Sequence, residues 1–432
     1  MKTRNLILMA ALAAAGLTSV TGALLVPAAA VAAEAKEAKK EAPKLGAKVG
    51  KPLRTAQEAI TAKNWEAATV ALAEAAAVEP KTPYEAFMVD ELGWYTKVQM
   101  KDYAGAVDSL RRAVESGFVP EADVPRRYKA LAQLTYELKD YPKAVEYGKK
   151  SLELAPAGSA DVAMIVAHAL YLSNDFAGAR TFVNAQVASA TAKPEEQLLL
   201  IGLRSNYELN DRPGTMRALE TLIRNYPAQK YWTDLLNNQL YETKTDRDLR
   251  VLYRLMNDTN VLSKPEEYSE MGTTLMTGGF PTEAQHVLER GLAANVFKGD
   301  MLTRAQGDLT RAKAAAEADR KELPGADAAL AAAKTGNEMV AMGKLFFSVG
   351  EYAKAADAFR KGLAKGGVTD ADDANALLGI ALSRADKGAE AIEAFDKIRD
   401  PKLGEVGKLW KLYIETSGQA AAAPAPAPAP AG

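Results

Sequence analysis

The sequence of 432 residues contains no cysteine and only two histidines. Without cysteine there can be no disulfide, no thiolate metal site, no cysteine nucleophile and no lipid attached to an N-terminal cysteine. His168 and His286 are far apart in the sequence, and no phosphate-binding glycine loop or H-E-x-x-H motif is present. These absences predict a protein that is not an enzyme and that has no catalytic, metal or cofactor site.

Aromatic residues and net charge are also low. Phe, Trp and Tyr make up 7% of the chain, and the formal net charge is −1. A nearly neutral chain lacks the basic stripe typical of nucleic-acid binding, so we expect no nucleic-acid partner. Runs of β-branched residues are scarce, whereas Ala, Leu, Glu and Lys are abundant. This composition favours helices over strands.

What the chain does have is a repeated pattern of small and large residues, clearest in residues 337–366. Its spaced motifs are M-G-x2-F at 342–346, G-E-Y at 350–352 and A-x3-F at 355–359. Small residues such as Gly343 and Ala355 allow two helices to cross closely, while the aromatic residues fill the space beside them. The pattern recurs about nine times between residues 53 and 400, at spacings near 34 residues.

This spacing resembles the L-G-x2-Y…A-x3-F pattern of the tetratricopeptide (TPR) repeat. The resemblance implies an all-α fold: a right-handed superhelix, or α-solenoid, of about nine helix-turn-helix repeats with a C-terminal capping helix. Residues 231–255, 362–370 and 408–415 are similar to periplasmic TPR proteins encoded beside TonB-type energy-transduction components. That narrower resemblance implies a role in envelope transport.

The order of segments predicts an exported protein. Lys2 and Arg4 precede an apolar run and then small residues, which is the order of a signal peptide over residues 1–33. An uncleaved membrane anchor is the alternative, because residues 6–33 are long enough to span a bilayer. We expect cleavage, a periplasmic location, no lipoprotein anchor and no membrane insertion of the mature chain.

The remaining segments follow from composition. The predicted order is a flexible charged linker at 34–52, repeats one to seven at 53–297, an Ala-rich charged helical insertion or degenerate repeat at 298–336, repeats eight and nine at 337–400, a capping helix at 401–417 and an Ala/Pro-rich disordered tail at 418–432. Pro324-Gly325 is expected to break the insertion.

In TPR proteins the first helix of each repeat lines a concave groove, and the resemblance implies that residues shortly after the small residue of the motif point into it. The predicted peptide-binding groove comprises Trp94, Arg126, Lys129, Gln133, Tyr136, His168, Tyr171, Arg204, Tyr207, Asn237, Tyr241 and Phe347. Aromatic and hydrogen-bonding residues on one surface are typical of peptide recognition. The alternative is that the tyrosines only fill space between neighbouring helices. The Lys/Asn clamp of chaperone-binding TPR domains is not reproduced at Lys129, Gln133, His168 and Arg204.

The sequence therefore predicts a scaffold that holds an extended segment of a cell-envelope protein in its groove. An alternative is a structural assembly factor of an outer-membrane or polysaccharide-export machine, acting through its convex face or its Ala-Pro tail. The sequence names no partner and leaves the oligomeric state open.

Overall fold

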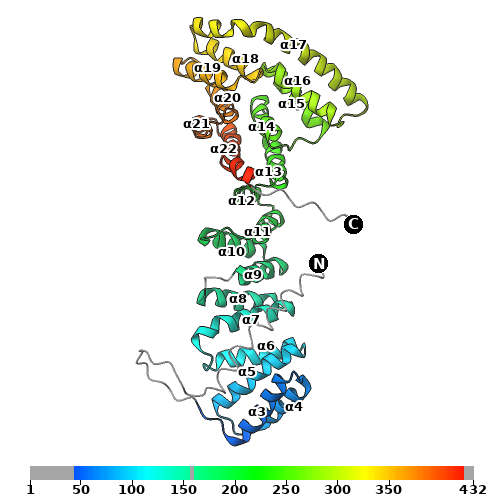
Figure 1. The fold of residues 1–432 in the computed structure, drawn as a ribbon, viewed down its shortest axis with the longest axis vertical. Coiled ribbons are helices and arrows are strands. Elements are labelled where there is room, and N and C mark those ends of the chain that lie inside the picture. The colour runs from blue at the N-terminus through cyan, green and yellow to red at the C-terminus, as the bar shows by residue number, and fades with distance from the viewer. Residues whose placement is uncertain (1–42, 156–159, 423–432) are drawn as a thin grey trace. The chain divides into compact units, whose positions relative to one another are not determined.

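The computed structural model describes residues 43–155 and 160–422. The chain divides into two compact units, Met1–Asp211 (unit 1) and Arg212–Gly432 (unit 2). The described part of the chain has twenty α-helices and no β-strand, which confirms the predicted all-α fold (Figure 1). The signal peptide at 1–33, residues 34–42 of the linker and the tail beyond 422 lie outside the described residues. The right-handed sense of the superhelix stays a prediction.

Unit 1 is a stack of helix-turn-helix hairpins. Its helices are α3 (Ala47–Thr61), α4 (Trp65–Ala77), α5 (Pro83–Gln99), α6 (Tyr103–Glu115), a 3₁₀ turn η1 (Glu121–Asp123), α7 (Val124–Glu137), α8 (Tyr141–Leu154), α9 (Ala160–Leu172), α10 (Phe176–Ser189) and α11 (Glu196–Glu208). The first helix of each hairpin contacts its second helix, and the second helix contacts the next hairpin. This arrangement confirms the predicted repeat.

The turns of unit 1 share one local structure. Lys101 and Lys139 have φ of 62°, which places both in the left-handed region that ends a helix. The next residue caps the second helix: Asp102 accepts a hydrogen bond from the Gly105 backbone N–H at 2.9 Å, and Asp140 caps α8 in the same way. Because the left-handed residue and the capping residue after it recur from turn to turn, the second helix of each hairpin leaves its turn in a similar direction.

The first helix of unit 1 begins earlier than expected. α3 starts at Ala47, inside residues 34–52 that were predicted to be a linker. Val49 and Leu53 are 2% and 3% exposed and face the core, and the Gly46 N–H donates to Glu85 Oε1 at 2.8 Å. Burial of these side chains stabilises the helix by more than Gly50 and Pro52, which are poor helix formers, destabilise it.

Unit 2 contains the later hairpins and two longer helices. Its helices are α12 (Arg212–Asn225), α13 (Gln229–Glu242), α14 (Asp246–Asp258), α15 (Pro265–Gly278), α16 (Pro281–Ala293), α17 (Gly299–Ala332), α18 (Gly336–Ser348), α19 (Tyr352–Lys365), α20 (Ala371–Arg384), α21 (Gly388–Phe395) and α22 (Pro401–Ala422).

The insertion is one continuous helix. α17 has 34 residues and packs against α15, α16 and α18 in unit 2, as Figure 1 shows. The predicted break at Pro324-Gly325 is wrong, because Pro324 lies inside the helix. Proline has no N–H to donate to the carbonyl group of the residue four positions earlier. Because Pro324 is exposed, water can donate to that carbonyl group instead.

The last helix does more than cap the final hairpin. α22 contacts α20 and α21 and also α12 and α14, at the start of unit 2 (Figure 1). Trp410 is fully buried, stacks on Phe395 with ring centroids 6.0 Å apart, and donates its Nε1–H to the Val251 carbonyl at 3.0 Å. Unit 2 is therefore closed on itself, across 159 residues of sequence.

α22 also continues to Ala422, five residues into the segment predicted as a disordered tail. Alanine has the highest helix propensity, and the first proline of the tail is Pro424. The helix can therefore run through the alanines that precede it.

Candidate functional site

The predicted groove residues are divided between the two units. Nine of the twelve belong to unit 1 and lie on α5, α7, α9 and α11. Asn237 and Tyr241 lie on α13 and Phe347 on α18, all in unit 2. The candidate site is therefore described for unit 1 alone.

Seven of the nine residues share one surface. α7 contacts α9, and α9 contacts α11, so these first helices lie side by side. We call this surface the first-helix face; its members are all at least partly exposed, and they are Arg126, Lys129, Tyr136, His168, Tyr171, Arg204 and Tyr207. The structure thus brings together cations, hydrogen-bond donors and aromatic rings from three consecutive hairpins.

Neighbouring first helices are joined by polar contacts on this face. Lys129 of α7 forms an ion pair with Asp161 of α9. The Tyr171 hydroxyl of α9 donates to Glu208 Oε1 of α11 at 3.3 Å. Partial burial raises the pKa of Tyr171, with Glu208 adding to the effect, so this phenol remains a donor at neutral pH.

Trp94 and Gln133 do not belong to the exposed groove that the sequence predicted. They are 3% and 5% exposed. Trp94 donates its Nε1–H to Glu91 at 3.2 Å and lies 5.3 Å from the Arg127 guanidinium, which is ion-paired with Glu91. Tryptophan is large enough to reach the next first helix, so this position packs between hairpins and joins α5 to α7.

Phe347 is also a core residue and not a groove residue. It is 1% exposed and lies 5.7 Å from Phe280 and 5.4 Å from Tyr352, measured between ring centroids. The closure of unit 2 covers this end of α18. Tyr241, in contrast, is 70% exposed, with the Arg212 guanidinium 5.0 Å and the Lys244 ammonium 4.9 Å from its ring.

A buried polar cluster in unit 2 was not predicted from the sequence. Arg254 of α14 donates to Glu283 of α16, with Nη2 to Oε2 at 2.7 Å, and its side chain is 0% exposed. Arg384 of α20 reaches the same Glu283 at 3.1 Å and Asp258 at 3.1 Å. The bonded partners in this cluster are up to 126 positions apart, and no repeat motif marks them.

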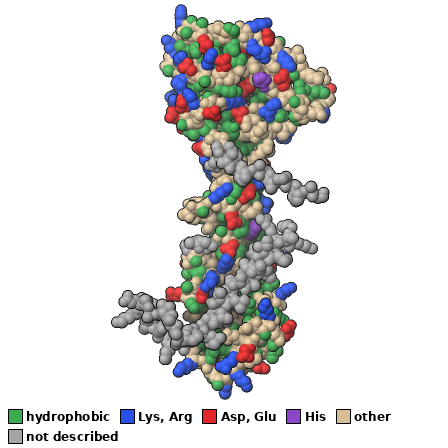
Figure 2. Space-filling model, viewed as in Figure 1, with side chains coloured by type: hydrophobic (Ala, Val, Ile, Leu, Met, Phe, Trp, Pro, Cys, Tyr) green, Lys and Arg blue, Asp and Glu red, His purple; other side chains and the backbone are tan. Residues whose placement is uncertain are grey.

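The two histidines and the acidic residues do not form a cluster in the described part of the chain. His168 lies in unit 1 and His286 in unit 2. No group of three His, Asp or Glu residues in the described part of the chain is placed to hold a metal ion. None of its helices is both long enough and apolar enough to cross a membrane. Figure 2 shows acidic and basic side chains interspersed on the visible face of each unit.

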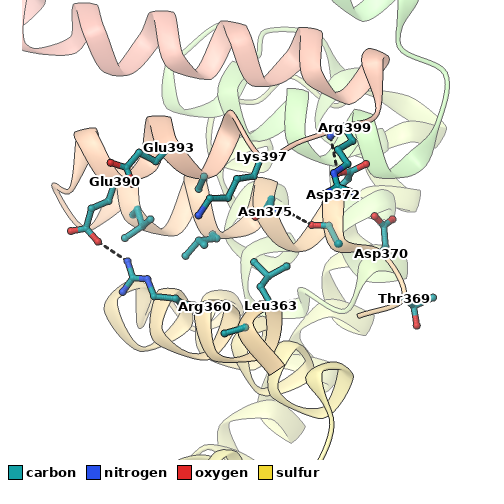
Figure 3. Close-up of a pocket in the computed structure, with 15 residues that line it drawn as sticks. Arg360, Leu363, Thr369, Asp370, Asp372, Asn375, Glu390, Glu393, Lys397 and Arg399 are labelled. Atoms are coloured by element: carbon teal, nitrogen blue, oxygen red, sulfur yellow. Dashed lines mark hydrogen bonds and ion pairs between the residues drawn. The ribbon is translucent and has the colours of Figure 1, made fainter. Parts of the chain in front are cut away.

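Cavities lie between successive second helices in each unit. A cavity of about 860 Å³ is bounded by α19, α20 and α21 of unit 2, where Arg360 and Glu390 form an ion pair at 2.6 Å (Figure 3). Asp372 accepts hydrogen bonds from the backbone N–H groups of Arg399 and Asp400. Two cavities of unit 1, about 400 and 620 Å³, likewise lie between successive second helices.

Solved structures with a similar fold have low sequence identity to this chain. No protein-family model and no curated sequence matches this chain. The chain is 13% identical to a chain of the Naa15/Naa10 complex bound to HypK-THB, covering 87% of this chain and 67% of that one, with a TM-score of 0.36. It is 13% identical to YrrB, described as a TPR protein with an unusual peptide-binding site, over 42% and 87% of the two chains, with a TM-score of 0.31.

A third similar structure is a TPR protein from Parabacteroides merdae, 12% identical, covering 78% of this chain and all of that chain, with a TM-score of 0.31. At these identities and TM-scores the structures resemble this chain in fold alone. The repeat motif and the helix pairing of this chain are therefore the observations that support an array of TPR-like hairpins.

Proposed function

We propose that this protein is an exported, non-enzymatic scaffold whose first-helix face binds an extended segment of a cell-envelope protein. The observation that carries the proposal is the meeting of seven partly exposed residues from α7, α9 and α11 on one surface of unit 1. Interaction surfaces are enriched in tyrosine and arginine, and this face contains three tyrosines and two arginines.

The chemistry of the face favours a peptide over a rigid surface. Tyr207 is 45% exposed and gives apolar area, and Arg204 beside it on α11 gives several fixed donors. An extended segment offers free backbone carbonyl groups to such donors. Anchors of this kind, each contributing about 2 kcal/mol, are suited to micromolar and reversible capture.

The basic, apolar and small residues at 1–33 support export to the periplasm. The similarity of residues 231–255, 362–370 and 408–415 to TPR proteins encoded beside TonB-type components supports a place in envelope transport. Fractionation of the producing cell tests this part: release of the mature chain with the periplasm is expected, and recovery in the cytoplasm would contradict it.

The binding site is tested by photo-crosslinking in living cells. A photoreactive amino acid at Arg204 or Tyr207 is expected to give crosslinks to an envelope protein. A matched probe at Lys149 or Glu153, which line the 620 Å³ cavity of unit 1 on the second-helix side, should give none.

The variant His168→Ala/Arg204→Ala/Tyr207→Ala should lose the complex and keep its helical circular dichroism. Crosslinks from the second-helix positions alone would move the site there.

The second-helix side supports a second candidate, an assembly factor that acts through this face or through the Ala-Pro tail. The observation that favours it is the set of open cavities between second helices. Deletion of residues 423–432 separates the candidates: binding to the first-helix face should survive the deletion, whereas attachment through the tail should be lost.

A further inference from the structure

A second surface of unit 1 stands out by its exposed apolar side chains. At the end of each first helix from α5 to α11, where the chain turns into the second helix, one large apolar side chain faces solvent. We call this row the turn edge; its residues and exposed fractions are Met100 43%, Leu138 42%, Leu172 46% and Leu209 36%. They are four of the nine exposed large apolar side chains of the described residues.

The first three turns add positive charge to this edge. Lys63, Lys101 and Lys139 occupy equivalent left-handed turn positions, with φ of 56°, 62° and 62°, and all three are exposed. The ion pairs of the described residues do not include these lysines. The aspartates after Lys101 and Lys139 are turned toward the second helices, where they cap backbone N–H groups. The second and third turns therefore present ammonium groups beside Met100 and Leu138, and Lys63 adds a third ammonium group at the preceding turn.

In unit 2 the corresponding edge is already covered by a helix. Phe280 and Phe347, at the turns of two hairpins, are 0% and 1% exposed. Arg254 of α14 lies 4.2 and 4.9 Å from their ring centroids and pairs with Glu283 beside the first of these turns. Asp258, one turn further along α14, pairs with Arg384 at the third turn. A helix of the same chain thus covers the turns of these hairpins, and one of its cations and one of its anions pair with a carboxylate and a guanidinium there.

The spacing of the turn edge also fits a helix. α7 contacts α9 and α9 contacts α11, and neighbouring packed helices lie about 8–10 Å apart, so Leu138, Leu172 and Leu209 are expected to follow one another at about that distance. A helix rises about 10.5 Å in seven residues, so one apolar residue every seven would meet one hairpin after another. An extended strand repeats the same face every ~7 Å and would fall out of step.

We propose that the turn edge of unit 1 binds an amphipathic helix of a partner protein, with apolar residues every seven positions and acidic residues beside them. α14 is the precedent for the covering helix, and the lysines of the first three turns set the sign of the partner's charge. This site is separate from the first-helix face and does not depend on the function proposed for that face.

The probe is a fluorescent synthetic helix of 28 residues with leucine every seven positions and glutamate on the flanking positions. Two control probes have the same composition in scrambled order, or lysine in place of glutamate. Fluorescence anisotropy with the purified chain is expected to show at least tenfold tighter binding of the acidic helix than of either control. Equal binding of the scrambled probe would overturn the proposal, because it would indicate nonspecific apolar adsorption.

Matched variants locate the site. Met100→Gln/Leu138→Gln/Leu172→Gln/Leu209→Gln should weaken binding at least tenfold. Val70→Gln/Leu154→Gln, which changes apolar residues of similar or greater exposure on second helices, should leave it unchanged. Lys63→Glu/Lys101→Glu/Lys139→Glu should reverse the preference, so that the lysine probe binds better than the acidic one. Unchanged binding in the first or third variant would overturn the proposal.

Two further measurements separate the alternatives. The variant His168→Ala/Arg204→Ala/Tyr207→Ala should bind the acidic helix as the wild type does, even if the function proposed for the first-helix face fails. Sedimentation of the wild type should show no self-association that the turn-edge substitutions remove. A dimer that depends on Met100 and Leu138 would identify a second copy as the occupant and would contradict the proposal.

Discussion

Arg254 is the residue on which unit 2 depends most clearly. Its guanidinium is buried between Phe280 and Phe347 and is neutralised by Glu283, to which it donates at 2.7 to 3.1 Å. Arg384 shares the same carboxylate. A buried charge is tolerated only when its partner is present, so Glu283 serves two cations at once.

We expect Glu283→Gln to lower the free energy of unfolding by about 3–5 kcal/mol, because two buried guanidinium groups lose their shared anion. The measurement is urea unfolding followed by circular dichroism. The matched control is Glu289→Gln, on the same helix, which removes a surface pair with Lys313 and should cost less than about 1 kcal/mol. Equal losses for the two variants would contradict this account.

The same carboxyl group gives a pH dependence. Burial opposes its ionisation, but Arg254 and Arg384 outweigh burial and hold the pKa of Glu283 below its ordinary value. Its contribution is therefore complete above the unfolded pKa of about 4.3 and is lost as the pH falls through the folded pKa. The stability difference between wild type and Glu283→Gln should stay constant from about pH 7 to 5.5 and shrink below about pH 4.3. Urea unfolding at each pH measures it, and a difference that grows on acidification would sink the explanation.

At the scale of single helices, packing prevails over local propensity in two places. α3 begins before Gly50 and Pro52 because Val49 and Leu53 are buried. α17 runs through Pro324 because its 34 residues are supported by the neighbouring helices of unit 2. The sequence signals for a break were present in both places, but the energy of contacts distant in sequence could not be inferred from them.

Pro324→Ala tests how much α17 is weakened by its proline. The new N–H can donate to the carbonyl group of Arg320, and alanine is about 3 kcal/mol better than proline inside a helix. We expect a gain of about 1–3 kcal/mol in the free energy of unfolding of unit 2, measured by urea unfolding. Gly325→Ala, with open space around the new methyl group, should gain about 1 kcal/mol. A loss of stability in both variants would show that α17 needs its proline and glycine.

At the scale of the whole molecule, the two units are connected differently. In unit 1 the main contacts of each hairpin are with its neighbours in sequence. In unit 2, α22 returns to α12 and α14. In an array of neighbouring hairpins, a destabilising substitution affects mainly the hairpins beside it. In a closed unit, the same kind of substitution lowers the stability of all the helices that close it.

Hydrogen exchange measured by mass spectrometry should reveal this difference. Leu131→Ala, at a site 1% exposed on α7, should raise exchange in α5 to α9 and leave α3 and α4 protected. Trp410→Ala should raise exchange in α20 to α22 and also in α14, because Trp410 bonds Val251. Lys408→Ala, an exposed change on α22, is the control. Protection of α14 in Trp410→Ala would contradict the closure of unit 2.

The candidate surface could be predicted in part. Repeat spacing selected Tyr136, Tyr171 and Tyr207, which are at least partly exposed on neighbouring first helices, and their role in binding stays a prediction. It also selected Trp94, the residue directly after the small residue Gly93, but Trp94 is buried against α7. Whether a side chain at such a position reaches solvent depends on the next hairpin, and that information is not local.

The sequence by itself determined the helices, their pairing into hairpins and the absence of disulfides, because small residues, turn residues and helix caps act over a few positions. Tertiary structure alone decided that α22 returns to α14, that Phe347 and Arg254 are buried, and that the turn edge is covered in unit 2 and open in unit 1. These outcomes depend on residues far apart in the sequence, from 29 positions for Arg254 and Glu283 to 159 for Trp410 and Val251, whose shape and charge match only after the hairpins have stacked.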